Sequence, residues 1–360
     1  MKNILLVEIK DIKTIVTLVR FINENNYVLL FHKKFKSTSN SNEYNYLTIL
    51  KIKKVLENEK LFNLIDKTYI TFHSKINLIQ IEKNQSKEKL ERNNYDCKIT
   101  KFTSYIKNGE FLYESINKKY LNEIFQYFEF YEFKNIEFIS SLDAIQNSIR
   151  KHALEDNQIY LSISLEEKFT QLTMIENGKI FNVVRLEFGL NKIYEYISEK
   201  MNIPIENSKN LFKTFGIVSF QDMIDNKVLH LVKDEFGFNK IFTKGDLSIY
   251  IKEKLNNLFL NINKKINDYK LDKNRLTLIF NGEIKALIGF QKYTLKFFNE
   301  LNINEFDSKL IGLKADTEFI TMGLILEIQK NIHNIQIKTK SNLSYTLKIN
   351  IFNKLFRMYN

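Results

Sequence analysis

The chain of 360 residues contains no tryptophan, one proline, one cysteine and only ten glycines. The single cysteine, Cys97, excludes a disulfide framework and fits a reducing compartment. The five histidines are scattered without the spacing of metal ligands, which argues against a metal site. No stretch reaches the roughly 18 uncharged apolar residues of a membrane-spanning helix. Together these absences predict a cytoplasmic protein without structural disulfides, a resident metal or a spanning segment.

The net charge of +12 would by itself suggest nucleic acid or an anionic membrane as a partner. The lysines that produce it are spread over the whole chain, among abundant asparagine, isoleucine and phenylalanine. This composition is typical of a chain shaped by an AT-rich genome, in which diffuse lysine usually forms a solvated surface. Because no known nucleic-acid-binding motif accompanies the charge, the sequence predicts no nucleic-acid partner.

The clearest local pattern is a β-meander in the middle of the chain. Its three predicted strands are Ile159–Ser164, Phe169–Ile175 and Ile180–Leu186. Asn177 and Gly178 lie between the second and third strands, and Asn-Gly is a preferred pair in tight hairpin turns. A helix is predicted near Leu190–Met201. A second helix carries the only proline, Pro204, in its first turn and Gly216 just past its last.

The flanking segments also have strand and helix patterns. A meander is predicted at the N-terminus, with strands Asn3–Ile9, Thr14–Phe21 and Tyr27–Phe35. Helices are predicted over Tyr46–Leu64, Asn117–Tyr131 and Asp246–Leu271, the last from apolar residues recurring at intervals of three and four. A strand is predicted at Arg275–Glu283, and a final apolar helix begins at Phe319.

This order of elements resembles the actin/Hsp70/sugar-kinase superfold, and most closely the bacterial cell-division family FtsA. In that family the central hairpin reads roughly Asp-Ile-Gly-Gly-Gly-Thr-Thr-Asp. A segment Pro-Leu-Glu-Glu-Ala-Glu-Arg-Ile-Lys stands there where this chain continues from Pro204. The resemblance implies an α/β, actin-like fold of two lobes with a short insertion of the FtsA 1C type.

The resemblance also implies a division of the chain into subdomains. Subdomain 1A would comprise residues 1–67 and 113–158, and a reduced 1C-like insertion would comprise residues 68–112. Subdomain 2A would comprise residues 159–200 and 246–340, with a 2B-like region at residues 201–245. Residues 341–347 would form a tether and residues 348–360 an amphipathic helix.

Nucleotides bind this superfold because glycine-rich hairpin loops let backbone N–H groups approach the phosphates, while carboxylates organise Mg²⁺. Here the corresponding positions carry mostly other residues: Glu8, Lys10, Asp11, Ser162, Ser164, Glu166, Lys209, Phe212 and a single retained glycine, Gly282. Because every motif is altered at once, we expect binding of ATP and magnesium to be weak or lost and the chain not to be an enzyme. The alternative is that Lys10, Lys168 or Lys209 still holds an anionic nucleotide without turnover.

The C-terminus has the pattern of a membrane-binding amphipathic helix. At about 100° per residue the apolar residues from Ile349 to Tyr359 share one half of the helical wheel, and basic and amide side chains fill the other. The predicted membrane-binding residues are Ile349, Ile351, Phe352, Lys354, Leu355, Phe356, Arg357, Met358 and Tyr359. FtsA carries its membrane-targeting helix at the same place. The alternative is a helix docked on the protein's own surface.

The resemblance implies a tether rather than a catalyst. An FtsA-like protein would hold filaments of the tubulin-like protein FtsZ to the cytoplasmic face of the cell membrane during division, with anionic lipids as a second partner and self-assembly into filaments. Lys227, Lys233 and Lys240 of the 2B-like region are candidates for contacting the acidic FtsZ C-terminal peptide. The alternative is an actin-like assembly ATPase or scaffold of another membrane complex, such as a pilus, that still binds nucleotide.

Overall fold

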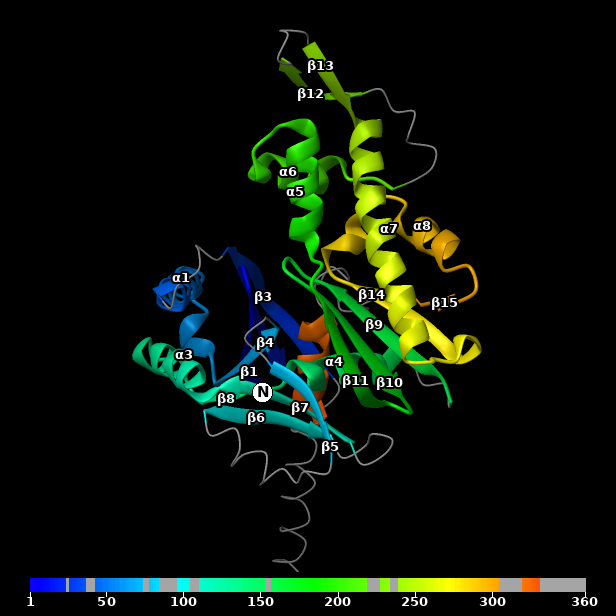
Figure 1. The fold of residues 1–360 in the computed structure, drawn as a ribbon. Coiled ribbons are helices and arrows are strands. Elements are labelled where there is room, and N and C mark those ends of the chain that lie inside the picture. Colours follow the sequence, from blue (N-terminus) through cyan, green and yellow to red (C-terminus); the bar gives the residue numbers. More distant parts are fainter. Residues whose placement is uncertain are drawn as a thin grey trace, which may run out of the picture.

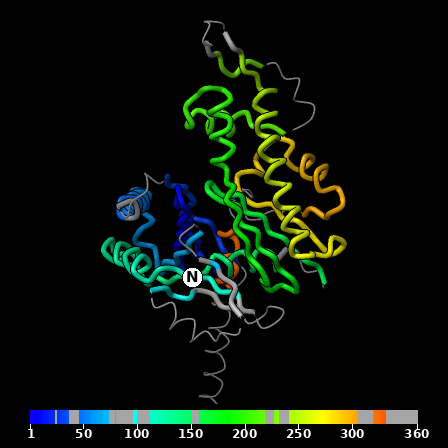
Figure 2. The backbone as a smooth tube through the Cα atoms, in the orientation of Figure 1, coloured from blue at the N-terminus to red at the C-terminus, as the bar shows by residue number. Residues whose placement is uncertain are grey.

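The computed structural model describes residues 1–23, 26–36, 43–73, 78–83, 96–103, 110–152, 157–218, 227–233, 239–304 and 319–330. These residues form two lobes, each built on a mixed five-stranded sheet (Figure 1). The N-terminal part of the chain forms the first lobe and the middle forms the second. The helix over residues 319–330 then returns to lie between the two lobes (Figure 2).

The sheet of the first lobe has the strand order β3-β2-β1-β4-β8. Its strands are β1 (Lys2–Lys10), β2 (Lys13–Phe21), β3 (Tyr27–Lys36), β4 (Lys67–His73) and β8 (Ile136–Phe138). The first three form the predicted antiparallel meander, which is confirmed, while β4 and β8 run parallel to β1. Leu5, Val7 and Ile9 of β1 pack in a core with α1 (Glu43–Asn58) and α3 (Lys118–Phe130).

The predicted end of the first helix is wrong. The helix expected over Tyr46–Leu64 ends at Asn58, because Lys60 adopts φ 58°, a left-handed conformation that an α-helix cannot continue through. The remaining residues form the 3₁₀ turn η1 (Phe62–Leu64) before β4 begins.

The sheet of the second lobe repeats this arrangement in the order β11-β10-β9-β14-β15. Its strands are β9 (Ile159–Leu165), β10 (Thr170–Glu176), β11 (Lys179–Leu186), β14 (Leu276–Asn281) and β15 (Asn302–Ile303). The predicted hairpin turn is confirmed, with Asn177 at φ 50° and Gly178 at φ 68°. The helices of this lobe are α5 (Leu190–Met201), α6 (Ile205–Phe215), α7 (Lys244–Asp268) and α8 (Phe290–Phe297). Pro204 precedes α6 as its N-cap.

Two small sheets extend from the lobes. One is a three-stranded antiparallel sheet of β5 (Leu78–Lys83), β7 (Glu110–Asn117) and β6 (Cys97–Thr103) beside the first lobe. The other is the hairpin of β12 (Val228–Lys233) and β13 (Asn239–Thr243), which stands above the second lobe at the N-terminal end of α7 (Figure 1). Residues 68–73, which the sequence places at the start of the 1C-like insertion, lie in β4 of the main sheet.

The two lobes share an apolar core. It contains Ile4 and Leu6 from the first sheet, Tyr160 and Ile279 from the second, and residues of α4 (Ser141–His152) and of the helix over 319–330. The two helices approach each other very closely, because a Cβ added to Gly323 would lie 1.8 Å from the backbone oxygen of Ala144. The lobes are therefore joined by packed helices as well as by the chain itself.

Candidate functional site

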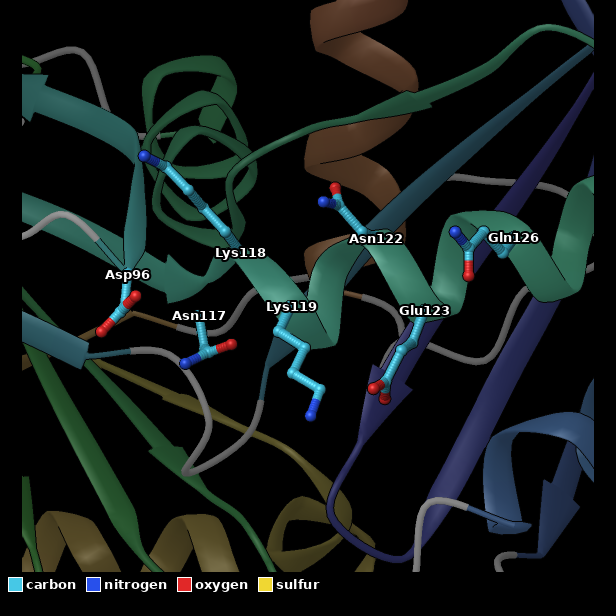
Figure 3. Close-up of a pocket in the computed structure, with 7 residues that line it drawn as sticks. All are labelled: Asp96, Asn117, Lys118, Lys119, Asn122, Glu123 and Gln126. Atoms are coloured by element: carbon cyan, nitrogen blue, oxygen red, sulfur yellow. The ribbon is translucent and has the colours of Figure 1, made fainter.

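A wide recess of about 810 Å³ lies beside the start of α3 (Figure 3). It is lined entirely by polar and charged side chains: Asp96, Asn117, Lys118, Lys119, Asn122, Glu123 and Gln126. The side chain of Asn117 already accepts a hydrogen bond from the backbone N–H of Tyr120 at 3.1 Å, so it serves as the N-cap of α3. None of the lining charges is buried, and the recess therefore defines no particular ligand.

Between the lobes, the ends of four strands come together. Lys10 at the end of β1 lies beside His73 at the end of the parallel strand β4. In the second lobe, Ser164 of β9 lies beside Asn281 of the parallel strand β14. Because parallel strands end at the same edge of a sheet, each lobe presents a pair of strand ends to the other. This is the position at which the sequence predicts an altered nucleotide site.

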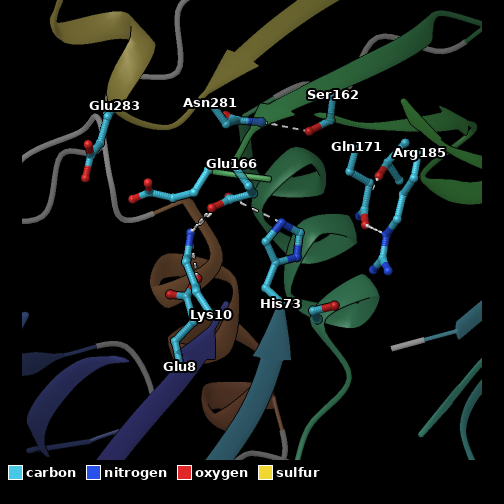
Figure 4. Close-up of polar contacts among 12 residues, drawn as sticks. Glu8, Lys10, His73, Ser162, Glu166, Gln171, Arg185, Asn281 and Glu283 are labelled. Carbon is cyan, nitrogen blue, oxygen red and sulfur yellow. Dashed lines mark hydrogen bonds and ion pairs between the residues drawn. The ribbon is translucent and has the colours of Figure 1, made fainter. Parts of the chain in front are cut away.

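A buried ionic cluster fills this position (Figure 4). Lys10 Nζ lies 3.1 Å from Glu8 Oε1 in its own lobe and 3.0 Å from Glu166 Oε1 of the second lobe. His73 Nε2 lies 3.4 Å from the same Glu166 oxygen, and the imidazole ring packs against Phe169 at 5.9 Å between centroids. All four polar residues are buried. We call Glu8, Lys10, His73 and Glu166 the interlobe cluster.

A second set of ion pairs surrounds the interlobe cluster. Lys13 at the start of β2 lies 2.7 Å from Glu283 Oε1 and 3.6 Å from Glu167 Oε1, both residues of the second lobe. Lys213 of α6 lies 3.5 Å from Glu283 Oε2. We call Lys13, Glu167, Lys213 and Glu283 the outer pairs. Together, the two sets of ion pairs connect β1, β2 and β4 of the first lobe to the loops that follow β9 and β14 of the second.

The electrostatics of the interlobe cluster favour the ionised forms of its main pair. Burial acts to lower the pKa of Lys10, but the carboxylates of Glu166 and Glu8 outweigh it and raise this pKa above its ordinary value of 10.5. Burial acts to raise the pKa of Glu166, yet Lys10 and His73 hold that pKa well below its ordinary value of 4.5. The Lys10 ammonium and the Glu166 carboxylate are therefore both charged near neutral pH.

The outer pairs divide into two kinds. Burial acts to raise the pKa of Glu283, but Lys13 and Lys213 lower it overall. For Glu167 burial prevails, and the pKa is raised despite the neighbouring charge of Lys13. Glu283 therefore contributes to stability as an anion, whereas ionisation of Glu167 is the less favourable of the two.

Little space remains among these side chains. The cavity lined by Lys10, Lys13, Glu166 and Gly282 measures about 10 Å³, which is roughly the room needed for one water molecule. Pockets that hold small molecules usually measure about 300–1,000 Å³. The position at which the sequence predicts an altered nucleotide site is therefore filled by the chain's own lysine and glutamate side chains.

The predicted site residues divide into those that meet here and those that do not. Glu8, Lys10, Glu166 and Gly282 lie together. Gly282 has φ 98°, and an added Cβ would lie 2.9 Å from the backbone oxygen of Leu165, so the backbone itself requires glycine there.

The remaining predicted positions lie around this centre or away from it. Ser162 and Ser164 are buried in β9, where Ser162 Oγ accepts a hydrogen bond from Asn281 Nδ2 at 2.7 Å, and Asp11 lies in the β1–β2 turn. The two α6 positions face elsewhere. Lys209 pairs with Glu206 at 2.9 Å, and Phe212 is buried against Tyr194 in the core of the second lobe.

Sequence reasoning missed four residues of the site, Lys13, His73, Glu167 and Lys213, and also the role of Glu283. The residue at the end of β4 could have been found from the topology, because a strand parallel to β1 must bring its last residue to the same edge. Lys213 lies one helical turn after the predicted Lys209 on α6 and pairs with Glu283, a contact that the sequence did not indicate.

The predicted membrane and partner residues are less fully defined. Residues 349–359 lie outside the described part of the chain. Within that part no helix combines the length and the apolar character needed to cross a membrane, and no group of side chains could hold a metal ion. Lys227 is exposed, with its ammonium 5.2 Å from the ring centroid of Phe215. Lys233 and Lys240 lie in β12 and β13, but their side chains are outside the description.

The two lobes, their paired meanders and the helices between them define an actin-like protein. Three solved structures illustrate the likeness. The PilM–PilN type IV pilus biogenesis complex matches with a TM-score of 0.64 at 12% identity, covering 90% of this chain and 97% of that one. MreB5 of Spiroplasma citri bound to ADP matches with a TM-score of 0.57 at 9% identity, covering 93% and 99%.

The ethanolamine utilization protein EutJ from Carboxydothermus hydrogenoformans matches with a TM-score of 0.53 at 10% identity, covering 91% and 90%. At the level of sequence, neither a family model nor a curated protein matches the chain. At these identities the likeness establishes the fold, and the predicted α/β actin-like class is confirmed. It does not single out FtsA among actin-like proteins.

The outer pairs generate a pH prediction. Because the folded-state pKa of Glu283 is lowered, its stabilising effect is present above the ordinary value of 4.5 and is lost as the pH falls below it. We expect Glu283→Gln to reduce the free energy of unfolding at pH 7 by about 1.5 to 3 kcal/mol. The difference in the free energy of unfolding between this variant and the wild type should shrink as the pH falls below 4.5. Urea unfolding at a series of pH values measures it.

The matched control is Glu206→Gln, which removes an exposed carboxylate that pairs with Lys209 on α6. A much smaller change is expected for it across the pH series, because the pair of Glu206 and Lys209 is exposed. A Glu283→Gln deficit that stayed constant down to acid pH would show that packing, not charge, is responsible.

Proposed function

We propose that the chain is a non-catalytic actin-like scaffold that tethers a protein assembly to the cytoplasmic face of the cell membrane. The observation that carries this proposal is the filled interlobe position, where about 10 Å³ of space remains among Lys10, Lys13 and Glu166. A hydrolase of this fold needs room for a nucleotide and a carboxylate free to position water and magnesium. Here the carboxylates of the cleft are engaged by lysines, so binding of ATP would be weak or lost.

The specific assignment is an FtsA-like role in cell division, with FtsZ filaments as the tethered assembly. It is supported by the amphipathic pattern over residues 348–360 and by the polar segment that precedes it. It is also supported by the hairpin of β12 and β13, which stands at the free end of the second lobe (Figure 1). Lys227, which directly precedes β12, is exposed.

Magnitudes suggest how such a tether would work. A fully buried apolar side chain contributes ~1.5–3 kcal/mol, but burial at a membrane surface is partial, and each Lys or Arg near anionic lipid adds ~1 kcal/mol. Because ordering the tail costs conformational entropy, one helix holds a monomer on the membrane only weakly. Several helices on one assembly bind far more firmly because each raises the effective concentration of the next. Membrane residence would therefore depend on self-assembly or on a multivalent partner.

A second candidate is a scaffold of another membrane complex that retains nucleotide. The specific observation in its favour is the likeness to the PilM–PilN pilus complex, with a TM-score of 0.64 over nearly the whole of both chains. The two candidates differ in partner and in nucleotide binding, and both can be tested on the purified protein.

The nucleotide test is a thermal-shift measurement with a non-hydrolysable ATP analogue and magnesium at millimolar concentration. A filled cleft predicts no increase in the melting temperature, because ligand that does not bind the folded state cannot stabilise it. MreB5, which has been solved bound to ADP, serves as the positive control. A concentration-dependent rise for this chain would favour the nucleotide-binding scaffold instead.

The membrane test is deletion of residues 348–360. We expect the full chain to sediment with vesicles that contain anionic lipid and the truncated chain to remain in the supernatant. A fluorescent fusion should likewise change from a membrane to a diffuse distribution. As a control for net charge, Lys354→Gln with Arg357→Gln keeps the apolar face and should weaken binding only in part. Unchanged membrane localisation of the truncated chain would remove the tether hypothesis.

The partner test uses a fluorescent FtsZ C-terminal peptide and measures anisotropy. Replacing Lys227, Lys233 and Lys240 together by glutamate should weaken binding about tenfold or more, since each exposed charge pair contributes up to about 1 kcal/mol. Lys330→Glu, an exposed lysine on the helix between the lobes, is the control and should bind like the wild type. Absence of binding by the wild type would favour the pilus-type candidate.

A further inference from the structure

We propose that Glu166 is a built-in ligand of the interlobe cleft, whose carboxylate takes the place of a bound anion and holds the two lobes closed. This inference rests on the proposed loss of nucleotide binding and adds to it a replacement for the missing ligand. It makes lobe closure a property of the chain itself rather than of a nucleotide.

The first support is the way the carboxylate is held. Lys10 Nζ donates to both oxygens of Glu166, at 3.0 and 3.1 Å, and His73 Nε2 lies 3.4 Å from one of them. Both nitrogen-bearing side chains come from the first lobe, whereas the carboxylate comes from the second. An ammonium group that donates to both oxygens of a buried carboxylate makes the kind of charge-assisted contact with which proteins bind carboxylate and phosphate ligands.

The second support is that the base of Glu166 is rigid. Its backbone N–H donates to the oxygen of Phe169 at 2.9 Å, and its own oxygen accepts from the N–H of Leu190 at 2.8 Å. The turn is packed tightly against Gly189, where an added Cβ would lie 2.3 Å from the oxygen of Glu167. The backbone of Glu166 is thus tied to Phe169, just before β10, and to Leu190, the first residue of α5. A pull on the carboxylate is therefore transmitted to the second lobe.

The third support is the distribution of contacts along β1. Ile4 and Leu6 belong to the apolar core shared by the lobes, and Glu8 and Lys10 continue on the same face at the period of two that a strand imposes. Thr321 of the helix over 319–330 donates to Glu8 at 3.4 Å, where the apolar core meets the ionic cluster. The apolar contacts therefore join the lobes near the start of β1, at Ile4 and Leu6, and the ion pairs join them at the end of β1, at Glu8 and Lys10.

Removing the carboxylate should therefore leave the fold intact and loosen the lobes. In Glu166→Ala, Lys10 keeps Glu8 as a partner, so the first lobe retains a paired charge. Loss of the two hydrogen bonds to Lys10 should lower the melting temperature by about 4 °C or more. The space vacated by the side chain is suited to formate or acetate, which should restore part of this loss.

The decisive measurement is the distance between the lobes in the full-length chain. Spin labels at the exposed positions Lys51 on α1 and Asn257 on α7, in a Cys97→Ser background, can be read by pulsed electron–electron double resonance. We expect one narrow distance distribution for the wild type and a broader or longer one for Glu166→Ala. Sodium formate should narrow the distribution of the alanine variant, whereas sodium chloride at equal ionic strength should not.

Glu166→Gln separates charge from space, because the amide fills the site and leaves no room for formate. It should show the broadened distribution without rescue. Glu132→Gln, which removes an exposed carboxylate paired with Lys53 at 2.8 Å, should behave as the wild type throughout. An unchanged distance in Glu166→Ala, or equal rescue by chloride, would overturn the proposal. Neither outcome depends on membranes or on a partner, so failure of the tether function would be seen separately.

Discussion

The structure depends on the burial of Lys10. A lysine ammonium at this depth is costly unless carboxylates meet it in good geometry, since an unpaired buried charge destabilises a fold by several kcal/mol. One partner, Glu8, lies on the same strand, but the other, Glu166, comes from the opposite lobe. The two lobes must therefore meet in one register for the charge to be satisfied. A buried ion pair adds little net stability over an apolar contact, but any arrangement of the lobes that separates the pair leaves an uncompensated buried charge and is penalised.

The same backbone layout can thus serve two chemistries. Glycine loops leave an opening between the lobes into which phosphates fit, whereas long charged side chains, here Lys10 and Glu166, fill that opening. The scarcity of glycine in the sequence is a sign of this change, and Gly282 is a position where the change did not occur. It remains glycine because φ 98° and the nearby oxygen of Leu165 leave no alternative for the backbone. The retained glycine therefore reflects turn geometry, and its presence alone is no evidence for a phosphate site.

Much of the fold could be predicted from local pattern. The two meanders, the turn at Asn177 and Gly178, and α5 follow from alternation, turn chemistry and helical period, which are properties of neighbouring residues. The site could be predicted only in part. Lys10 and Glu166 are 156 residues apart, and nothing local marks them as partners. His73 is set beside Lys10 by the parallel register of β4, which no hairpin turn encodes. The end of α1 was missed because Lys60 adopts a left-handed conformation that its residue type does not signal.

An internally closed cleft also changes where regulation can act. A ligand bound between two lobes can set the angle between them, and thereby the surfaces offered to neighbours, because it contacts both lobes. If the chain supplies its own anion, that angle responds little to nucleotide, and the switch must lie in contacts outside the cleft. The contacts proposed above, a C-terminal segment with an amphipathic sequence pattern and the lysines in and beside β12 and β13, would each bind with low affinity. Weak sites become effective only when many copies are held together. A fixed lobe geometry would suit the proposed tether, since identical subunits would then present the same surface at all times and assembly itself would determine when the membrane is bound.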